Sequence, residues 1–97
     1  MLLVVRFDGA VDIIDVPEFI IANIEDYRKQ FLNWLGDENI DHDYWTYENG
    51  VKYGLSFRSN AFVEWLNTFP LSNTSDVAKT VETFISEYDR NLSSIFF

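Results

Sequence analysis

The acidic segment Asp37–Glu48, with the sequence DENIDHDYWTYE, holds the residue types most able to do chemistry. It contains five carboxylates and neither lysine nor arginine. Carboxylate oxygens coordinate hard cations such as calcium, and they also attract basic proteins. The same segment carries Trp45 and Tyr47, two residue types that dominate the energetics of protein interfaces. Three interpretations follow: a metal site, an acidic surface for a basic partner, or the polar start of a hairpin.

The oxygen side chains of this segment are spaced almost as in a calcium loop. Asp37, Asn39, Asp41 and Glu48 resemble positions 1, 3, 5 and 12 of an EF-hand. The sixth position, however, is His42 instead of the glycine that makes the sharp turn. A strand of four steps ending at Glu48 would also carry that carboxylate roughly 13 Å away. We therefore expect no metal and no cofactor, and we keep a divalent-metal (calcium) domain using this loop as an alternative.

Residues that catalyse reactions are scarce in this chain. There is one histidine and no cysteine, which excludes thiol–imidazole catalysis and metal centres with several histidines. His42, between two aspartates, is a candidate pH-sensitive group, but no nucleophile or orienting partner accompanies it. The four glycines form no phosphate-binding loop. The sequence therefore predicts a protein that is not an enzyme.

The net charge of −9 is concentrated in one half of the chain. Residues 1–48 hold eleven acidic and three basic residues, whereas residues 49–97 hold five acidic and four basic ones. Such a charge opposes contact with nucleic acid phosphates and with anionic membranes. No segment approaches the roughly 18 apolar residues of a membrane span, and the apolar start is too short for a signal peptide. We expect a cytoplasmic protein that binds neither nucleic acid nor membrane directly.

Turn signals and apolar periodicity predict strands and a helix in the first third of the chain. Two strands, Leu2–Phe7 and Val11–Val16, flank the dipeptide Asp8-Gly9, which favours a tight hairpin turn. A helix is expected over Asp15–Leu35, with its first residue as N-cap, because apolar residues recur there at helical spacing. Gly36 is a suitable residue to end this helix.

A second hairpin is predicted around Asn49-Gly50, between residues 43–48 and 51–57. A two-residue turn there places Trp45 opposite Gly54 and Tyr47 opposite Lys52. One face of this hairpin is expected to face the core and carries Tyr44, Thr46, Val51, Tyr53, Leu55 and Phe57. The other face can leave aromatic rings in water and carries Asp43, Trp45, Tyr47, Lys52, Gly54 and Ser56.

Two further helices are predicted, at 61–69 before Pro70 and at 77–92, where apolar residues again recur at helical spacing. The complete order is ββαββαα. The expected fold is a single acidic α+β domain over residues 1–97, with an antiparallel sheet from two hairpins packed against helices.

The sequence favours a small acidic protein-interaction module. We expect an inhibitor, immunity-type or anti-defence factor that binds a basic partner, such as a nuclease or another nucleic-acid enzyme, by charge mimicry. The expected partner-binding residues are Asp37, Glu38, Asp41, Asp43, Trp45, Tyr47 and Glu48. Packing of Trp45 against a helix is the competing interpretation of that aromatic residue. A homo-oligomeric accessory subunit is the remaining alternative, and a monomer or weak homodimer is expected.

Overall fold

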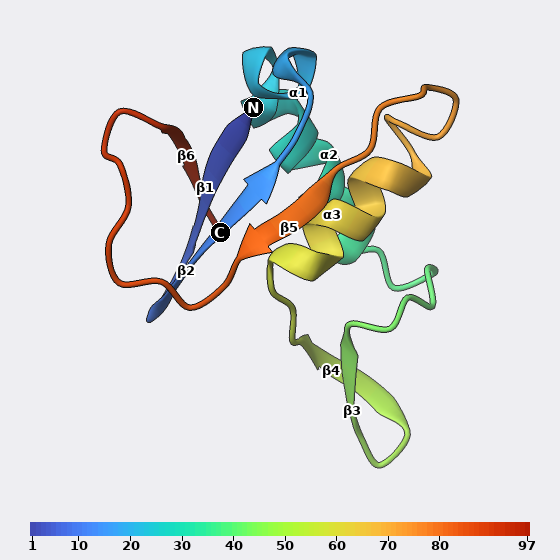
Figure 1. Ribbon diagram of the computed structural model, residues 1–97. Helices are drawn as coiled ribbons and strands as arrows, with labels where there is room; N and C mark the ends of the chain where they lie inside the picture. The colour runs from blue at the N-terminus through green and yellow to red at the C-terminus, as the bar shows by residue number, and fades with distance from the viewer.

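The computed structural model describes residues 1–97 and contains three helices and two separate sheets (Figure 1). The α+β class predicted from the sequence is confirmed, as is the order ββαββα of the first part of the chain. The elements are β1 (Leu2–Phe7), β2 (Ala10–Asp15), α1 (Glu18–Ala22), α2 (Ile24–Leu35), β3 (Trp45–Glu48), β4 (Val51–Leu55), α3 (Ser59–Thr68), β5 (Lys79–Glu82) and β6 (Ser93–Phe96).

The first hairpin forms where the turn signal predicts it. β1 and β2 pair antiparallel from Leu2 opposite Asp15 to Phe7 opposite Ala10. Gly9 takes a φ of 77°, a conformation that side chains with a Cβ rarely adopt. The register also brings the N-terminal ammonium group of Met1 within 2.7 Å of the Asp15 carboxylate. Asp15 therefore ends β2 and pairs with the N-terminus, and it does not cap a helix as predicted.

The predicted long helix is divided into α1 and α2 at Asn23. The Asn23 side-chain amide donates a hydrogen bond to the Phe19 carbonyl oxygen, 3.1 Å away. This residue has φ −124° and ψ 29°, outside the helical range, so it closes one helix and precedes the next. Asparagine favours such sites because its short side chain competes for nearby backbone groups. Gly36 follows the last residue of α2, as predicted.

The predicted helix at 77–92 is wrong, because this segment contains strand β5 and irregular backbone, and β6 follows it. The main sheet has the order β5-β2-β1-β6, with β6 parallel to β1 and β5 antiparallel to β2. The Asn67 side chain of α3 makes two hydrogen bonds to the backbone of Ala78, at 2.8 and 2.9 Å. These bonds and the pairing with β2 hold the segment extended, and the apolar residues Val77, Val81 and Phe84 are exposed.

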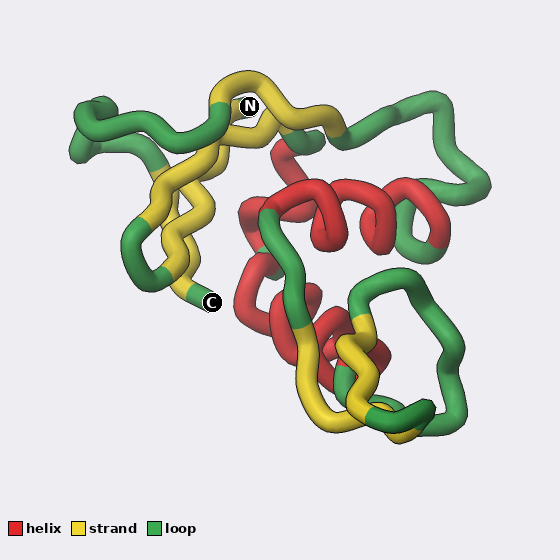
Figure 2. The backbone as a smooth tube through the Cα atoms, turned by 90° about the horizontal axis from the view of Figure 1, so that it is seen from below, coloured by secondary structure: helices red, strands yellow, loops and turns green.

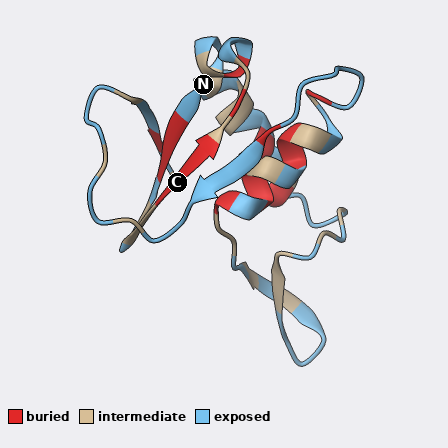
Figure 3. Cartoon of the chain, viewed as in Figure 1, coloured by how far each residue is buried: buried red, intermediate tan, exposed pale blue.

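The core lies between the main sheet and the helices α2 and α3 (Figure 3). Phe31 of α2 is fully buried at its centre. Five aromatic rings, from α2 itself and from three other parts of the chain, lie with their centroids 5.2–6.2 Å from the Phe31 ring; these are Trp34, Phe57, Phe62, Trp65 and Phe97. Residues far apart in the sequence are therefore joined by one aromatic cluster.

The hairpin of β3 and β4 forms a sheet of its own and projects from the rest of the molecule (Figures 1 and 2). The predicted union of the two hairpins in one sheet is therefore wrong. Neither strand has an extensive contact with another helix or strand. None of their residues is buried, whereas buried residues are common in β1, β2 and α3. This hairpin is the least covered part of the secondary structure.

A β-bulge shifts the register of this hairpin. Tyr47 pairs with Lys52 as predicted, but Trp45 pairs with Leu55 and not with Gly54. The shift leaves Tyr53 as an extra residue between the two parts of the ladder. The Thr46 side chain lies close to Gly54, so that an added Cβ would stand 3.1 Å from the Thr46 hydroxyl oxygen and would require this side chain to shift. A two-residue turn alone therefore predicts only the outer half of the pairing.

Candidate functional site

The base of the projecting hairpin is fixed by His42. Its imidazole ring lies between Trp34 and Trp45, with ring centroids 4.7 and 5.0 Å away, and is nearly parallel to the second. The Nε2 atom is 2.6 Å from the carbonyl oxygen of Leu35, near the end of α2, and Nδ1 accepts the backbone N–H of Tyr44 at 3.1 Å. Both ring nitrogens are thus used, and the histidine has a structural role.

Lys52 of β4 joins the acidic segment to the hairpin. Its ammonium group is 2.6 Å from both the Asp41 carboxylate and the Glu38 carbonyl oxygen, and it lies 5.1 Å from the centre of the Trp45 ring. The hydrogen bond and the charge of Lys52 lower the pKa of Asp41 below its ordinary value of 3.8. The same hydrogen bond raises the pKa of Lys52. Trp45 is half-buried by these contacts, which favours packing over free exposure.

The pairing of Asp41 predicts a dependence of stability on pH. Because the folded-state pKa of Asp41 is lowered, its stabilising contribution is complete above about pH 4 and is lost as the pH falls through the folded value. Asp41→Asn is expected to lower the melting temperature at about pH 6, and this difference should be smaller at about pH 3, below the ordinary pKa of the carboxyl group. Melting curves of the native and Asp41→Asn proteins at both pH values test this expectation.

Asp43→Asn is the matched control, because the Asp43 carboxylate is exposed and makes neither an ion pair nor a hydrogen bond. It should change the melting temperature little at either pH. An Asp41→Asn difference that persists unchanged in acid would contradict the assigned ion pair.

Tyr44 also connects the hairpin to a helix, because its hydroxyl group donates a hydrogen bond to the Glu64 carboxylate of α3. Burial of the ring, together with this hydrogen bond, raises the pKa of the Tyr44 hydroxyl well above its usual range. The tyrosine therefore stays neutral and connects the start of the hairpin to α3. Together with His42, it fixes the hairpin to two helices.

The predicted core face of the hairpin is wrong for β4, although Tyr44 and Phe57, at its two ends, do pack against the core. Val51, Tyr53 and Leu55 of β4 are exposed, the first two by 64% and 66%. On β3, Tyr47 is 54% exposed, as its predicted place on the outer face allows. The hairpin stands away from the helices, so no element covers its apolar side chains. These four residues are called the hairpin apolar patch below. They lie on both faces of the hairpin, because Tyr47 and Leu55 share the face of Trp45 and Lys52 whereas Val51 shares that of Glu48.

The predicted partner-binding carboxylates all lie at the surface. Asp37, Glu38, Asp41, Asp43 and Glu48 are exposed, the first four in the segment before β3 and the last beside the hairpin turn. Asp41 is the one held by a cation, and Asp37 accepts a hydrogen bond from the backbone N–H of Asn39. No three carboxylate or imidazole groups of the protein gather closely enough to hold a metal ion.

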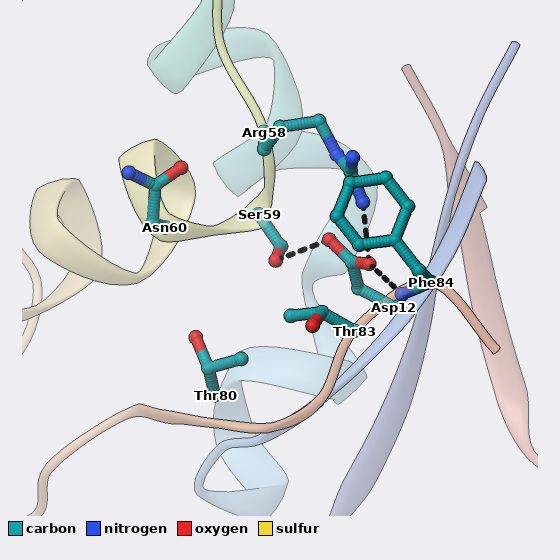
Figure 4. Close-up of a pocket in the computed structure, with 7 residues that line it drawn as sticks. All are labelled: Asp12, Arg58, Ser59, Asn60, Thr80, Thr83 and Phe84. Atoms are coloured by element: carbon teal, nitrogen blue, oxygen red, sulfur yellow. Dashed lines mark hydrogen bonds and ion pairs between the residues drawn. The ribbon is translucent and has the colours of Figure 1, made fainter.

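A second cluster, centred on Asp12 of β2, was missed by the sequence reasoning (Figure 4). The Asp12 carboxylate is fully buried and accepts three hydrogen bonds: from the Arg58 guanidinium at 2.6 Å, the Ser59 hydroxyl at 2.6 Å and the Phe84 backbone N–H at 3.0 Å. These donors come from the start of α3 and from the segment after β5. Asp12 therefore joins three distant parts of the chain.

A hollow of about 130 Å³ lies beside this cluster. Hydroxyl groups of Thr80 and Thr83 and the amide of Asn60 line it together with the cluster residues (Figure 4). The Phe84 ring stacks on the Arg58 guanidinium at 3.9 Å, and Phe84 has a φ of 54°, an unfavourable conformation for a bulky residue. The hydrogen bond from its backbone N–H to Asp12 holds it there. The volume suits one small polar group and is well below that of an ordinary ligand pocket.

The sequence does contain one signal for the Asp12 cluster. In the segment Ala10–Asp15, Asp12 stands between Val11 and Ile13, inside an otherwise apolar strand. A carboxylate at such a position is buried only with partners, because an unpaired buried charge is strongly unfavourable. The identity of the partners, Arg58 and Ser59, depends on the fold and was not available from spacing.

Comparison of the chain with protein family models, curated protein sequences and solved structures gave no match. None of the three helices is long and apolar enough to cross a membrane.

Proposed function

We propose that this protein is a protein-interaction module that binds a basic partner through the β3–β4 hairpin. The observation that carries the proposal is the hairpin apolar patch, defined by Tyr47, Val51, Tyr53 and Leu55. Large exposed apolar side chains concentrated on one small element of a protein are typical of interaction sites. Tyrosine in particular supplies much of the binding energy at interfaces.

The charge around the patch supports a basic partner. Glu48 lies in the hairpin, and Asp37, Glu38 and Asp43 precede it, all exposed and none paired with a cation. An acidic rim around an apolar centre steers a positively charged protein and excludes acidic ones. Proteins that handle nucleic acids carry positively charged surfaces, so an inhibitor or immunity-type role against such a partner fits this arrangement.

The contacts at the base of the β3–β4 hairpin explain how the hairpin can act as a recognition element. His42, stacked between two tryptophans, fixes the hairpin to α2, and Lys52 binds the acidic segment. A site held in one geometry loses less entropy on binding. Trp45 belongs to this support, and the contact residues are the exposed groups around it.

The test is affinity capture from lysate of the source cells with three immobilised forms of the protein. The first is native. The second carries Asp37→Asn, Glu38→Gln, Asp43→Asn and Glu48→Gln, and the third carries Glu25→Gln, Asp76→Asn, Glu82→Gln and Glu87→Gln. The third form has the same net charge as the second, and its four altered side chains are exposed and unpaired.

We expect one basic protein to bind the native and third forms and to bind the second form about tenfold to a thousandfold more weakly, because each of the four exposed charge pairs contributes roughly 0.3–1 kcal/mol. Binding should weaken with salt. Equal losses in the two variants would show that only the overall charge matters, and equal retention would remove the acidic rim from the proposal.

A further inference from the structure

We propose that the hairpin takes an extended, lysine- or arginine-containing segment of its partner as a third strand along the free edge of β4. This inference rests on the proposed function and specifies the form of the partner segment that the hairpin recognises. The observations that carry it are the pairing of the two strands, the bulge at Tyr53, and the exposed side chains of β4.

The two-stranded sheet is incomplete as it stands. β3 and β4 pair only with each other, so each has an edge whose backbone N–H and C=O groups pair with no other strand. A two-stranded hairpin alone is marginally stable in water, and a third strand or a packed helix is needed for independent stability. Here no helix packs over the strands. An added strand supplies the missing contact.

The geometry favours β4 as the receiving strand. The residues that precede β3 contact its first residue, Trp45. The Trp45 indole N–H donates to the Ile40 carbonyl oxygen at 2.7 Å, and the His42 ring stacks on the Trp45 ring. β4 pairs with no strand other than β3, and the hairpin projects from the rest of the molecule (Figures 1 and 2). The bulge also leaves the backbone of Tyr53 outside the β3–β4 ladder.

Side chains on β4 and around it determine what the third strand must carry. An added strand lies about 4.8 Å from β4, so its apolar side chains would pack on Leu55, which shares the face of Trp45. Lysine or arginine side chains on the opposite face can reach beyond β4 to the unpaired carboxylate of Glu48, which shares the face of Val51. A segment that alternates basic and apolar residues satisfies both requirements, in the manner of other peptides bound by strand addition.

The experiment uses three acetylated, amidated seven-residue peptides and the isotope-labelled native protein. The first peptide is Lys-Val-Lys-Val-Lys-Val-Lys. The second has the same sequence with every interior peptide nitrogen methylated, which keeps its charge but removes its strand hydrogen-bond donors. The third replaces each lysine by glutamate. Nuclear magnetic resonance titration measures affinity and identifies the amide groups of the protein that shift.

We expect the first peptide to shift the amides of Val51–Leu55 and to bind at least tenfold more tightly than either other peptide. Equal binding of the first and second peptides would overturn strand addition while leaving recognition of positive charge intact. Equal binding of the first and third would contradict the basic partner itself. Failure of all three to bind would overturn the inference, and the capture experiment would decide the proposed function separately.

Pairing of the β4 edge with a second copy of this chain is tested with the protein in the absence of peptide. If light scattering showed a dimer and the β4 amides were protected from exchange without peptide, the occupant of the edge would be a second copy of this chain. That result would also overturn the inference. We expect a monomer, because two chains of net charge −9 repel each other.

Discussion

Replacing Asp12 by alanine is expected to lower the free energy of unfolding by about 2–4 kcal/mol. The change removes the acceptor of three hydrogen bonds and leaves the Arg58 guanidinium, the Ser59 hydroxyl and the Phe84 N–H without their partner. The value lies below that of a fully buried ion pair, because the Arg58 side chain is 31% exposed and water can solvate it in part. Urea denaturation followed by circular dichroism measures the loss.

Two variants make this result specific to the Asp12 cluster. Asp12→Asn keeps the shape and one acceptor oxygen, so its loss should be smaller than that of the alanine variant. Asp8→Ala removes an exposed carboxylate from the turn that follows β1 and should change stability by less than about 0.5 kcal/mol. Equal stability of the native and Asp12→Ala proteins would refute the role of this carboxylate in joining β2, α3 and the segment after β5.

Replacing Phe31 by alanine is expected to lower the free energy of unfolding by about 3–5 kcal/mol. Phe31 is fully buried, and its ring contacts aromatic residues of α2 itself, α3 and the segments before α3 and after β6. Removing the ring leaves a cavity that these large, interlocked neighbours cannot easily fill. A loss of this size is a large part of the roughly 5–15 kcal/mol that stabilises a protein of this size.

The same denaturation measurement includes two controls. Phe31→Leu keeps most of the apolar volume and should cost about 1–2 kcal/mol. Phe69→Ala alters a ring that is 48% exposed at the end of α3, and it should have a smaller effect than Phe31→Ala. If Phe31→Ala unfolded at the same urea concentration as the native protein, the aromatic cluster would not be the centre of the core.

Local signals predicted the elements that depend on neighbouring residues. The two hairpin turns, at Asp8-Gly9 and Asn49-Gly50, lie where the dipeptides indicated, with positive φ at Gly9, Asn49 and Gly50. The helix α3 was predicted close to its observed bounds, because its apolar spacing and Pro70 are local properties of the chain. The fold class follows from these elements and was predicted correctly.

Long-range contacts decided what the sequence predicted incorrectly. Residues 77–92 have helical spacing, but Asn67 and the free edge of β2 hold part of this segment as strand β5. The intrinsic preference for a helix is weak, and tertiary contacts commonly override it. The burial of Val51, Tyr53 and Leu55 was also predicted incorrectly, since it depends on how far the hairpin stands from the helices.

For the candidate site, the sequence identified the acidic residues but not the apolar ones beside them. The five carboxylates from Asp37 to Glu48 are at the surface, as a composition so rich in acid indicates. Tyr53 and Val51 were expected in the core, because β-branched and aromatic residues in strands are usually packed. Their role in binding is a proposal that arose from their exposure in the structure.

The parallel pairing of β1 with β6 has a consequence for the order of events during folding. Leu3 pairs with Ser93, so one edge of β1 can pair only with residues about ninety positions later in the chain. The hairpin of β1 and β2 can form early, whereas the β1–β6 pairing requires closure of a long loop and is expected late. During synthesis, an apolar strand containing Leu3, Val4 and Val5 thus keeps an open edge until β6 emerges, and this open edge favours aggregation during that time.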